Sequence, residues 1–235
     1  MRIIYTDLEL AQMQAEALFV HDASGRLLRI NESNPDGPAP RFFLARTAAG
    51  NLWRTRYDLP ADLAAELERL AADEPVISDL QSPVRHLEEY TEILSNHSVI
   101  SDIEAGPAYY LPELDTSTDA VTITPQNMSL LQRYYPYALS SLHELAPIVV
   151  LVADGVAVAA CFCARITARV AEAGVYTIEA YRGRDYATEA VRGWAAEVRA
   201  SDKLPLYSTS WENNASQAVA AKLGAVQYGA DFSVT

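Results

Sequence analysis

The residues whose types and spacing point most clearly to a chemical role lie in the stretch EAYRGRDYATEAV, Glu179 to Val191. The pattern predicts a strand ending near Tyr181, then a turn, then a helix starting near Thr188. The first amides of a helix have no partner inside it, and the helix dipole adds partial positive charge, so such a turn can bind phosphate. Arg182 and Arg184 would add two permanent charges. A solvated surface turn is the alternative, because spacing alone is weak evidence.

A carboxylate, Asp185, stands in the middle of this turn. If it faced an incoming anion, the two charges would repel each other. Asp is also a common helix-start residue, and we favour the interpretation that its side chain caps the helix that enters at Thr188. Under that interpretation the turn still binds phosphate, but with lower affinity. A loop that no longer binds phosphate is the remaining alternative.

The elements that would position this turn alternate between strand and helix. Two strands flank the turn signal at Asp154-Gly155, and another strand precedes the phosphate-type turn. A helix to about Ala200, a strand, a second helix and a closing strand follow. Most strands follow one another through short turns, and helices come between strands only near the end of the chain. This order indicates a mixed α/β (α+β) layer structure.

The first half of the chain has a different pattern. A short helix is expected at Leu8–Ala17, two hairpins at the turns Asp22–Gly25 and Thr47–Gly50, and helices after Pro60 and over Pro83–Ser95. Residues 105–120 lack periodicity and are rich in Pro, Gly, Ser and Thr. We therefore predict two domains, 1–114 and 115–235.

The order of the second-half motifs resembles the GNAT superfamily of N-acetyltransferases. The turn R-x-x-D-x-A, from Arg182 to Ala187, matches the ends of the family motif Q/R-x-x-G-x-G/A, and Asn213 precedes Gly224 by eleven residues as in the family. The resemblance covers roughly 120–235 and is similar to a bacterial branch with an added N-terminal region. It implies a mixed, mostly antiparallel sheet with helices on both faces, preceded by a smaller α/β domain.

The resemblance also implies an acetyl-CoA site. The pantetheine arm would pair with the backbone of one strand and contact two residues before and in the last helix, while Arg182 and the turn amides would hold the pyrophosphate. The implied contacts are Tyr176, Thr177, Ile178, Arg182, Gly183, Arg184, Asp185, Tyr186, Ala187, Thr188, Asn213 and Ser216. The chain departs from the family at Asp185, which replaces the central Gly of the motif, and at Ala220, which replaces a Tyr that protonates the leaving thiolate.

Catalysis needs a base for the acceptor amine and a proton donor for the thiolate. Glu172 falls where some family members carry a catalytic Glu, and a solvent-facing Glu at a strand start is the alternative. Ser216 or an ordered water would replace the missing Tyr as proton donor. His143 and Glu144 are interpreted as surface residues at a helix end.

Charge and composition exclude several classes of partner. The net charge of −13 argues against nucleic acid and anionic membranes, and it is uneven: 1–114 carry 19 acidic and 9 basic residues, a net of −10, against −3 for 115–235. The acidic half would attract a cationic ligand or simply be a solvated surface. Cys161 and Cys163 share one face of a strand and read as buried apolar residues, with no metal pattern. No span or signal peptide is visible, which predicts a cytoplasmic protein.

The sequence thus predicts an acetyl-CoA-dependent N-acetyltransferase that needs no metal and acts on an amine of a small molecule or peptide. A homodimer is an open expectation. A CoA-binding regulator without catalysis is one alternative, favoured by Asp185 and Ala220, and an interaction module on the same fold is another.

Overall fold

The computed structural model describes residues 5–32, 37–115 and 117–235. The chain forms two compact units: the first unit comprises Met1–Tyr109, Ser208–Asn213 and Gln227–Thr235, and the second comprises Tyr110–Tyr207 and Asn214–Val226. The end of the chain therefore belongs to the same unit as its beginning. The assignment of separate domains to 1–114 and 115–235 stays a prediction. The N-terminal residues used to judge a signal peptide lie partly outside the described residues.

The first unit is built on a sheet with the strand order β4-β3-β11-β5, beside a separate β1-β2 hairpin. Its elements are α1 (Asp7–Leu18), β1 (Phe19–His21), β2 (Leu27–Ile30), β3 (Phe42–Thr47), β4 (Gly50–Thr55), α2 (Ala61–Asp73), α3 (Leu87–His97), β5 (Ile103–Tyr110) and β11 (Val226–Val234). Both predicted hairpins and all three predicted helices are confirmed. The strand β5 was not predicted, because Gly106 and Pro107 break its pattern.

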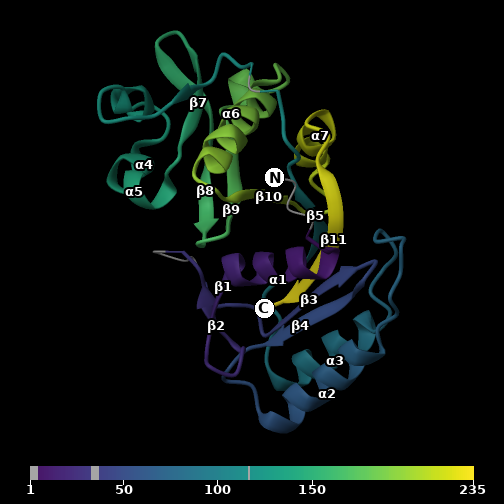
Figure 1. Cartoon of the computed structure of the whole chain (residues 1–235). Helices are drawn as coiled ribbons and strands as arrows, with labels where there is room; N and C mark the ends of the chain where they lie inside the picture. Colours follow the sequence, from purple (N-terminus) through teal and green to yellow (C-terminus); the bar gives the residue numbers. More distant parts are fainter. Residues whose placement is uncertain (1–4, 33–36, 116) are drawn as a thin grey trace. The chain divides into compact units, whose positions relative to one another are not determined.

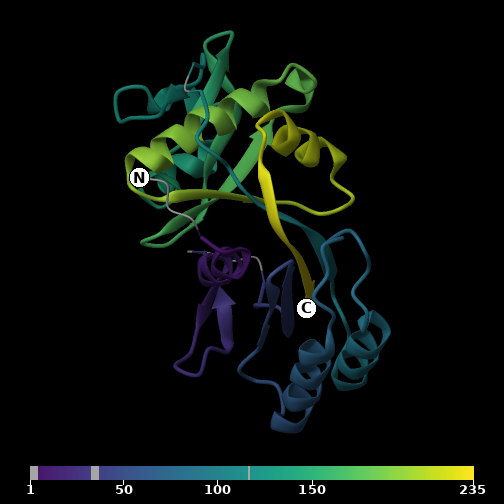
Figure 2. The same cartoon turned by 45° about the vertical axis from the view of Figure 1, so that its right-hand side comes forward.

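Helices cover both faces of this sheet, as Figures 1 and 2 show. The helices α2 and α3 lie side by side and pack on Phe42 and Phe232, and the Phe42 ring stacks on Tyr90 of α3 with centroids 4.6 Å apart. On the other face, Gln14 of α1 donates a hydrogen bond to Asp231, which alternates with Phe232 along β11. Strand β3 is consequently buried along its whole length.

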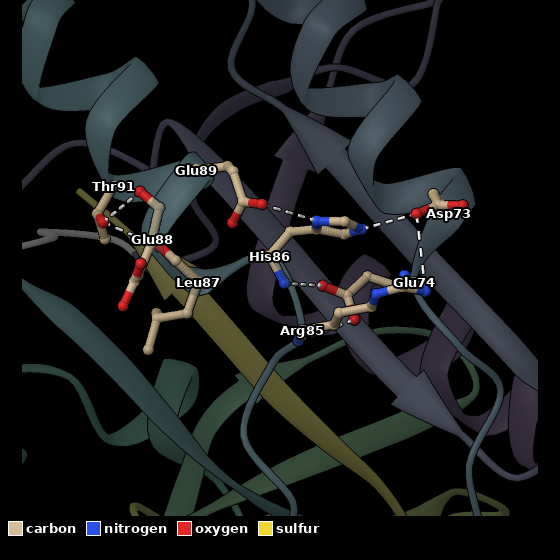
Figure 3. A network of polar contacts seen from close by, with 8 residues as sticks. All are labelled: Asp73, Glu74, Arg85, His86, Leu87, Glu88, Glu89 and Thr91. Carbon is tan, nitrogen blue, oxygen red and sulfur yellow. Dashed lines mark hydrogen bonds and ion pairs between the residues drawn. The ribbon is translucent and has the colours of Figure 1, made fainter.

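A polar cluster joins the end of α2 to the start of α3 (Figure 3). We call it the His86 network; it consists of Asp73, Glu74, Arg85, His86 and Glu89. Glu74 is a buried residue, 4% exposed, and its carboxylate accepts hydrogen bonds from the backbone N–H groups of Arg85 (3.1 Å) and His86 (3.0 Å). The His86 ring contacts Asp73 Oδ2 through Nε2 at 2.9 Å and Glu89 Oε1 through Nδ1 at 3.4 Å. These contacts hold the connection between the two helices in one conformation.

The second unit contains strands in the order β10-β9-β8-β7-β6, all antiparallel except the parallel pair β9–β10. Its elements are β6 (Val121–Thr122), η1 (Met128–Leu131), α4 (Pro136–Ser140), α5 (Leu142–Leu145), β7 (Val149–Ala153), β8 (Val156–Ile166), β9 (Val170–Thr177), η2 (Glu179–Tyr181), α6 (Tyr186–Ala200), β10 (Leu204–Ser208) and α7 (Asn214–Lys222). A mixed, mainly antiparallel α+β fold is therefore confirmed.

The two faces of this sheet differ in what covers them. Helix α6 packs so closely on one face, the α6 face, that a Cβ on Gly193 would lie 2.9 Å from Val149 Cγ1. The next residue, Val150, points to the other face, where it joins a cluster with Leu131 and Tyr135; we call this the Tyr135 face. Helix α7 contacts α6.

The two cysteines lie on β8 and are buried, as predicted. Burial raises the pKa of the Cys161 thiol well above its usual range and raises the pKa of Cys163 to about 11. Both are therefore protonated, weakly reactive core residues at neutral pH.

Within residues 5–32, 37–115 and 117–235, no helix has the length and apolar character needed to span a bilayer. The same residues bring together no group of three His, Cys, Asp or Glu side chains that would hold a metal ion.

Candidate functional site

The turn before α6 has the geometry of an anion site. The helix begins at Tyr186, two residues earlier than predicted. Gly183 and Asp185 both have left-handed backbone conformations, with φ of 74° and 60°, and the turn is exposed. The helix has 15 residues, so its dipole is fully developed, and the amides of its first turn have no intrahelical acceptor. These amides therefore remain available to a ligand.

Asp185 corrects our interpretation of this turn. It occupies the N-cap position, but its side chain makes no capping hydrogen bond. The left-handed conformation turns the carboxylate away from the helix, since a capping residue normally has extended φ and ψ. Asp185 thus adopts the conformation that a glycine would supply, and Asp is among the few residue types that tolerate it. Its Oδ1 instead pairs with Lys222 Nζ, at the end of α7, and both side chains are exposed.

Two arginines flank the turn on its surface. Arg182 donates from Nε to the carbonyl of Thr177 at 3.2 Å, which ties it to the end of β9. The Arg184 guanidinium lies over the Tyr181 ring, 5.4 Å from its centroid. Both side chains are exposed, so their remaining N–H groups can reach an anion on the turn.

Strands β9 and β10 diverge after a short paired stretch. Their parallel register covers three pairs, Val170–Leu204, Ala171–Pro205 and Glu172–Leu206, and β9 then continues for five residues to Thr177. The far edge of β9, on the side away from β8, is therefore open to an added partner from Ala173 onward. We call this opening the splay.

The register with β8 decides which backbone groups face the splay. Ile178 donates its N–H to Val158 and accepts at its carbonyl from Tyr181, so it cannot pair with an added strand. In an antiparallel pair every second residue directs its backbone groups toward the partner strand, so the N–H of Tyr176, two residues before Ile178, also points toward β8. The carbonyl of Tyr176 accepts a hydrogen bond from the Tyr135 hydroxyl at 3.1 Å. The structure thus contradicts the predicted pairing of pantetheine with Tyr176 and Ile178.

The backbone groups of Thr177 point away from β8, and its predicted contact with pantetheine stays a prediction. By the same alternation Val175 and Ala173 also present their backbone groups to the splay. Sequence reasoning missed these two residues, since only the register between β8 and β9 identifies the outward-facing set.

Glu172 lies at the vertex of the splay and is 2% exposed, so the solvent-facing alternative is wrong. Along β9 it shares a face with Gly174 and Tyr176. A Cβ on Gly174 would come 2.5 Å from the Phe162 ring, which places Glu172 on the Tyr135 face. Arg165 of β8 stands opposite Glu172 in the register.

The other face of the splay carries a pair of hydroxyls. Leu206 is paired with Glu172 and shares its face, so the next residue, Tyr207, points to the α6 face. Its Oη lies 2.7 Å from Ser216 Oγ, on α7. Ala220, one turn further along α7, is 1% exposed and has no proton to give. Tyr207 was not predicted to be near this site.

Three tyrosines form an aromatic cluster on the Tyr135 face. The rings of Tyr137 and Tyr176 each meet Tyr135 edge to face, with centroids 6.4 Å and 6.1 Å from it. Tyr135 is buried, whereas Tyr137 and Tyr176 are about half exposed and present apolar surface beside the open strand. His143 and Glu144 are exposed on α5, in agreement with the surface interpretation.

The two residues predicted to contact pantetheine at the last helix, Asn213 and Ser216, belong to different units. Asn213 belongs to the first unit, so its contact with pantetheine stays a prediction. Ser216 lies in the second unit, at the position just described.

The sequence of the chain decides its family. The family model for the acetyltransferase (GNAT) domain matches residues 81–226, more than half of the chain. The chain belongs to the GNAT acetyltransferase family. No match was found among curated proteins.

Solved structures of GNAT proteins are similar to this chain at low sequence identity. A GCN5-related N-acetyltransferase-like protein from Streptococcus suis is 13% identical with a TM-score of 0.50, covering 87% of each chain. A GNAT acetyltransferase from Colwellia psychrerythraea is 13% identical with a TM-score of 0.47, covering 99% of this chain and 98% of the other. A GNAT-family protein from Novosphingobium aromaticivorans is 17% identical with a TM-score of 0.46; the match covers 58% of this chain and 66% of the other.

Proposed function

We propose that the second unit binds acetyl-CoA in the splay and transfers its acetyl group to an amine. The observation that carries the proposal is the register of β9 and β10, which ends at Glu172–Leu206 and leaves the outer edge of β9 open up to the α6 turn. An extended ligand with an anionic end fits this arrangement, because an open strand edge and a helix N-terminus follow one another along the chain.

Each part of acetyl-CoA has residues that suit it. The amides from Gly183 to Thr188 and the Arg182 guanidinium would hold the pyrophosphate. The outward backbone groups of Thr177, Val175 and Ala173 would pair with the amide groups of the pantetheine arm. The co-substrate supplies an activated acyl thioester; the protein supplies its position.

Glu172 is the residue we assign as general base. An amine is mostly protonated at neutral pH and must lose a proton to attack, and the Glu172 carboxylate can take that proton directly or through a water. A β9 amide that faces the splay would donate to the thioester oxygen as negative charge develops there. The acceptor then approaches from the Tyr135 face, where Tyr137 and Tyr176 offer an apolar surface for its body.

Binding is the first test of this proposal. Isothermal titration with acetyl-CoA should show binding, and a ligand specific for the folded state should stabilise it by about 2.7 kcal/mol at a concentration of 100 times Kd. Dephospho-CoA and pantetheine serve as truncated probes, and the loss of the pyrophosphate should weaken binding most. Absence of both heat and thermal shift with acetyl-CoA would refute the proposal.

Turnover separates an enzyme from a CoA-binding regulator. Acetyl-CoA consumption is measured with a panel of alkyl, aryl-alkyl and peptide amines. The exchange Glu172→Gln should lower kcat by about 10²–10⁴-fold while acetyl-CoA binding is retained. Glu179→Gln is the matched control, because Glu179 is exposed on η2. Binding without turnover by any amine would favour the regulator, and equal rates in the two variants would remove Glu172 as the base.

A further inference from the structure

A groove runs along the outer side of α2 and α3, the two helices that cover one face of the sheet in the first unit. The helices lie side by side (Figure 1), and they are antiparallel, because the His86 ring at the start of α3 contacts Asp73 at the end of α2. The groove between them, which we call the α2–α3 groove, has a volume of about 490 Å³. That volume lies in the range of sites that bind ligands.

The floor of the α2–α3 groove is aliphatic. Leu63 and Leu70 of α2 and Ile93 of α3 line it. Leu70 belongs to the core beneath the helices, while Leu63 and Ile93 pack against that core and stay partly exposed. Exposed acidic side chains alone would form an ordinary solvated surface. An aliphatic floor in a concave site differs from such a surface, because a bound partner gains free energy by covering it.

The walls of the groove carry four carboxylates and one guanidinium. Asp62, Glu66 and Arg69 are spaced by four and three residues on α2, so they form one row along the helix. Glu89 and Glu92 line the groove from α3. Negative charges on both sides of a concave site repel one another unless a cation comes between them. The walls therefore favour a cationic occupant.

Three of these carboxylates are available to a ligand. Over residues 5–32, 37–115 and 117–235, the side chains of Asp62, Glu66 and Glu92 make no hydrogen bond or ion pair. Glu89 is turned to the His86 ring, with Oε1 3.4 Å from Nδ1 (Figure 3). In the same described ranges, no three acidic side chains gather closely enough to hold a metal ion. The groove thus suits several cations spread along it, rather than a single ion.

We propose that the α2–α3 groove binds a basic amphipathic helix of a partner protein. The apolar stripe of that helix covers the floor, and Lys or Arg side chains on both sides of the stripe pair with the walls. Helix α2 has 13 residues and is about 20 Å long, so a helix of similar length can lie along the groove. The proposal concerns the first unit and does not depend on acetyl transfer.

The charge of the surrounding region supports this class of partner. Residues 1–114 carry 19 acidic and 9 basic residues, so the region as a whole has the same sign of charge as the groove. Such a field speeds the approach of a basic partner and repels acidic proteins and nucleic acids. Long-range attraction and the local contacts therefore select the same partner.

The experiment uses the full-length protein and a synthetic peptide as the probe. The peptide has about 14 residues, with leucines at helical spacing, lysines on both sides of the leucine stripe, and a fluorescent label. Fluorescence anisotropy measures its Kd at low and at high salt, and circular dichroism measures the helix that it gains. We expect saturable binding together with a gain of helix in the peptide.

Two sets of variants separate the walls from the floor. Glu66→Gln combined with Glu92→Gln removes one charge from each wall and should weaken peptide binding by about three- to tenfold at low salt. This loss should shrink at high salt. Leu63→Gln makes the floor polar and should weaken binding by about fourfold, a loss that persists at high salt. Urea denaturation checks that each variant is folded, and if Leu63→Gln is not, the wall variant still decides the test.

The matched control removes the same charge from the same helices outside the groove. Glu68 and Glu88 are exposed on α2 and α3 and do not line the groove. Glu68→Gln combined with Glu88→Gln should therefore keep the Kd within about twofold of the wild type. A peptide of the same composition in scrambled order, and spermine as a flexible polycation, are the control ligands.

The outcomes decide both the site and its occupant. Equal weakening in the two double variants would show a general attraction of charge and overturn the site. Equal affinity for the scrambled peptide, or equal affinity for spermine, overturns the helix as the occupant, and so does the absence of saturable peptide binding. Titration with acetyl-CoA tests the proposed function separately, because none of these substitutions lies in the second unit.

Discussion

The His86 network and the α6 turn both gather charged residues around a short connection, but they use their backbone amides in opposite ways. In the network, the buried carboxylate of Glu74 accepts from two backbone N–H groups of the connection between α2 and α3. In the turn, the carboxylate of Asp185 avoids the helix amides and pairs with the exposed Lys222 side chain. Amides satisfied internally contribute to stability, whereas amides left accessible can bind a ligand. Substitutions in the two regions should therefore affect different measurements.

The largest expected effect is on stability, in the first unit. Glu74→Ala leaves two backbone N–H groups without their acceptor in a part-buried to buried site, at a cost of about 1–3 kcal/mol for each group. We expect a loss of roughly 2–5 kcal/mol in the free energy of unfolding, measured by urea denaturation.

The control for that experiment is Glu66→Ala, an exposed position on the same helix. It should change stability by less than about 0.5 kcal/mol. Neither variant should change the Kd for CoA if the two regions act separately. A large change in CoA affinity for Glu74→Ala, with stability retained, would break the comparison.

The next effect is on CoA binding, in the second unit. Arg182→Ala removes a guanidinium held at the end of β9 by Thr177 and should weaken CoA binding by about 1.5–3 kcal/mol, because a charge-assisted hydrogen bond to phosphate is lost. Titration calorimetry measures it. Arg169→Ala is the matched control, since Arg169 is exposed just before β9 begins. Equal losses in both variants would indicate a general charge effect rather than a contact at the turn.

A smaller effect is expected at Lys222. Lys222→Ala leaves the charge of Asp185 unbalanced beside the turn, and CoA should bind more weakly by on the order of 0.5–1 kcal/mol, as for exposed unit charges a few ångströms apart in water. Stability should change by no more than about 1 kcal/mol, because the pair is exposed. Lys203→Ala removes the same charge from the other end of α6 and should leave the Kd unchanged.

Sequence reasoning identified the parts of the site that depend on local pattern. The strand–turn–helix order, Arg182 and the small residues of the turn are visible as motifs, and so is the helix that follows them. The sequence-based interpretation of Asp185 as a capping residue was wrong. Capping is the common role of Asp at a helix start, whereas the positive φ of this position is set by the turn as a whole.

The rest of the site depends on contacts between distant segments. Only the pairing of β8 with β9 shows that Ala173 and Val175, rather than Tyr176 and Ile178, face the splay. The Tyr207–Ser216 contact and the Asp185–Lys222 pair each join a strand or turn to α7, and no local pattern reports them. The strand β5 was missed for a related reason: Gly106 lets the segment pass so close to Thr209 that an added Cβ would lie 1.7 Å from its carbonyl oxygen.

The smallest and most informative effect is expected at Asp185 itself. Asp185→Asn removes the charge but keeps a side chain that tolerates a φ of 60°, and Asp185→Gly removes the charge and the Cβ together. Both should tighten CoA binding by a few-fold, and the gain should shrink with added salt if it comes from charge. Unfolding free energy should change by less than about 1 kcal/mol in either variant, since no capping bond is lost and the pair with Lys222 is exposed.

If Gly tightens binding more than Asn and the difference persists at high salt, close approach of the ligand to the backbone is the cause. If neither variant changes the Kd at any salt concentration, the Asp185 charge does not act on the ligand, and Lys222→Ala should then be silent as well.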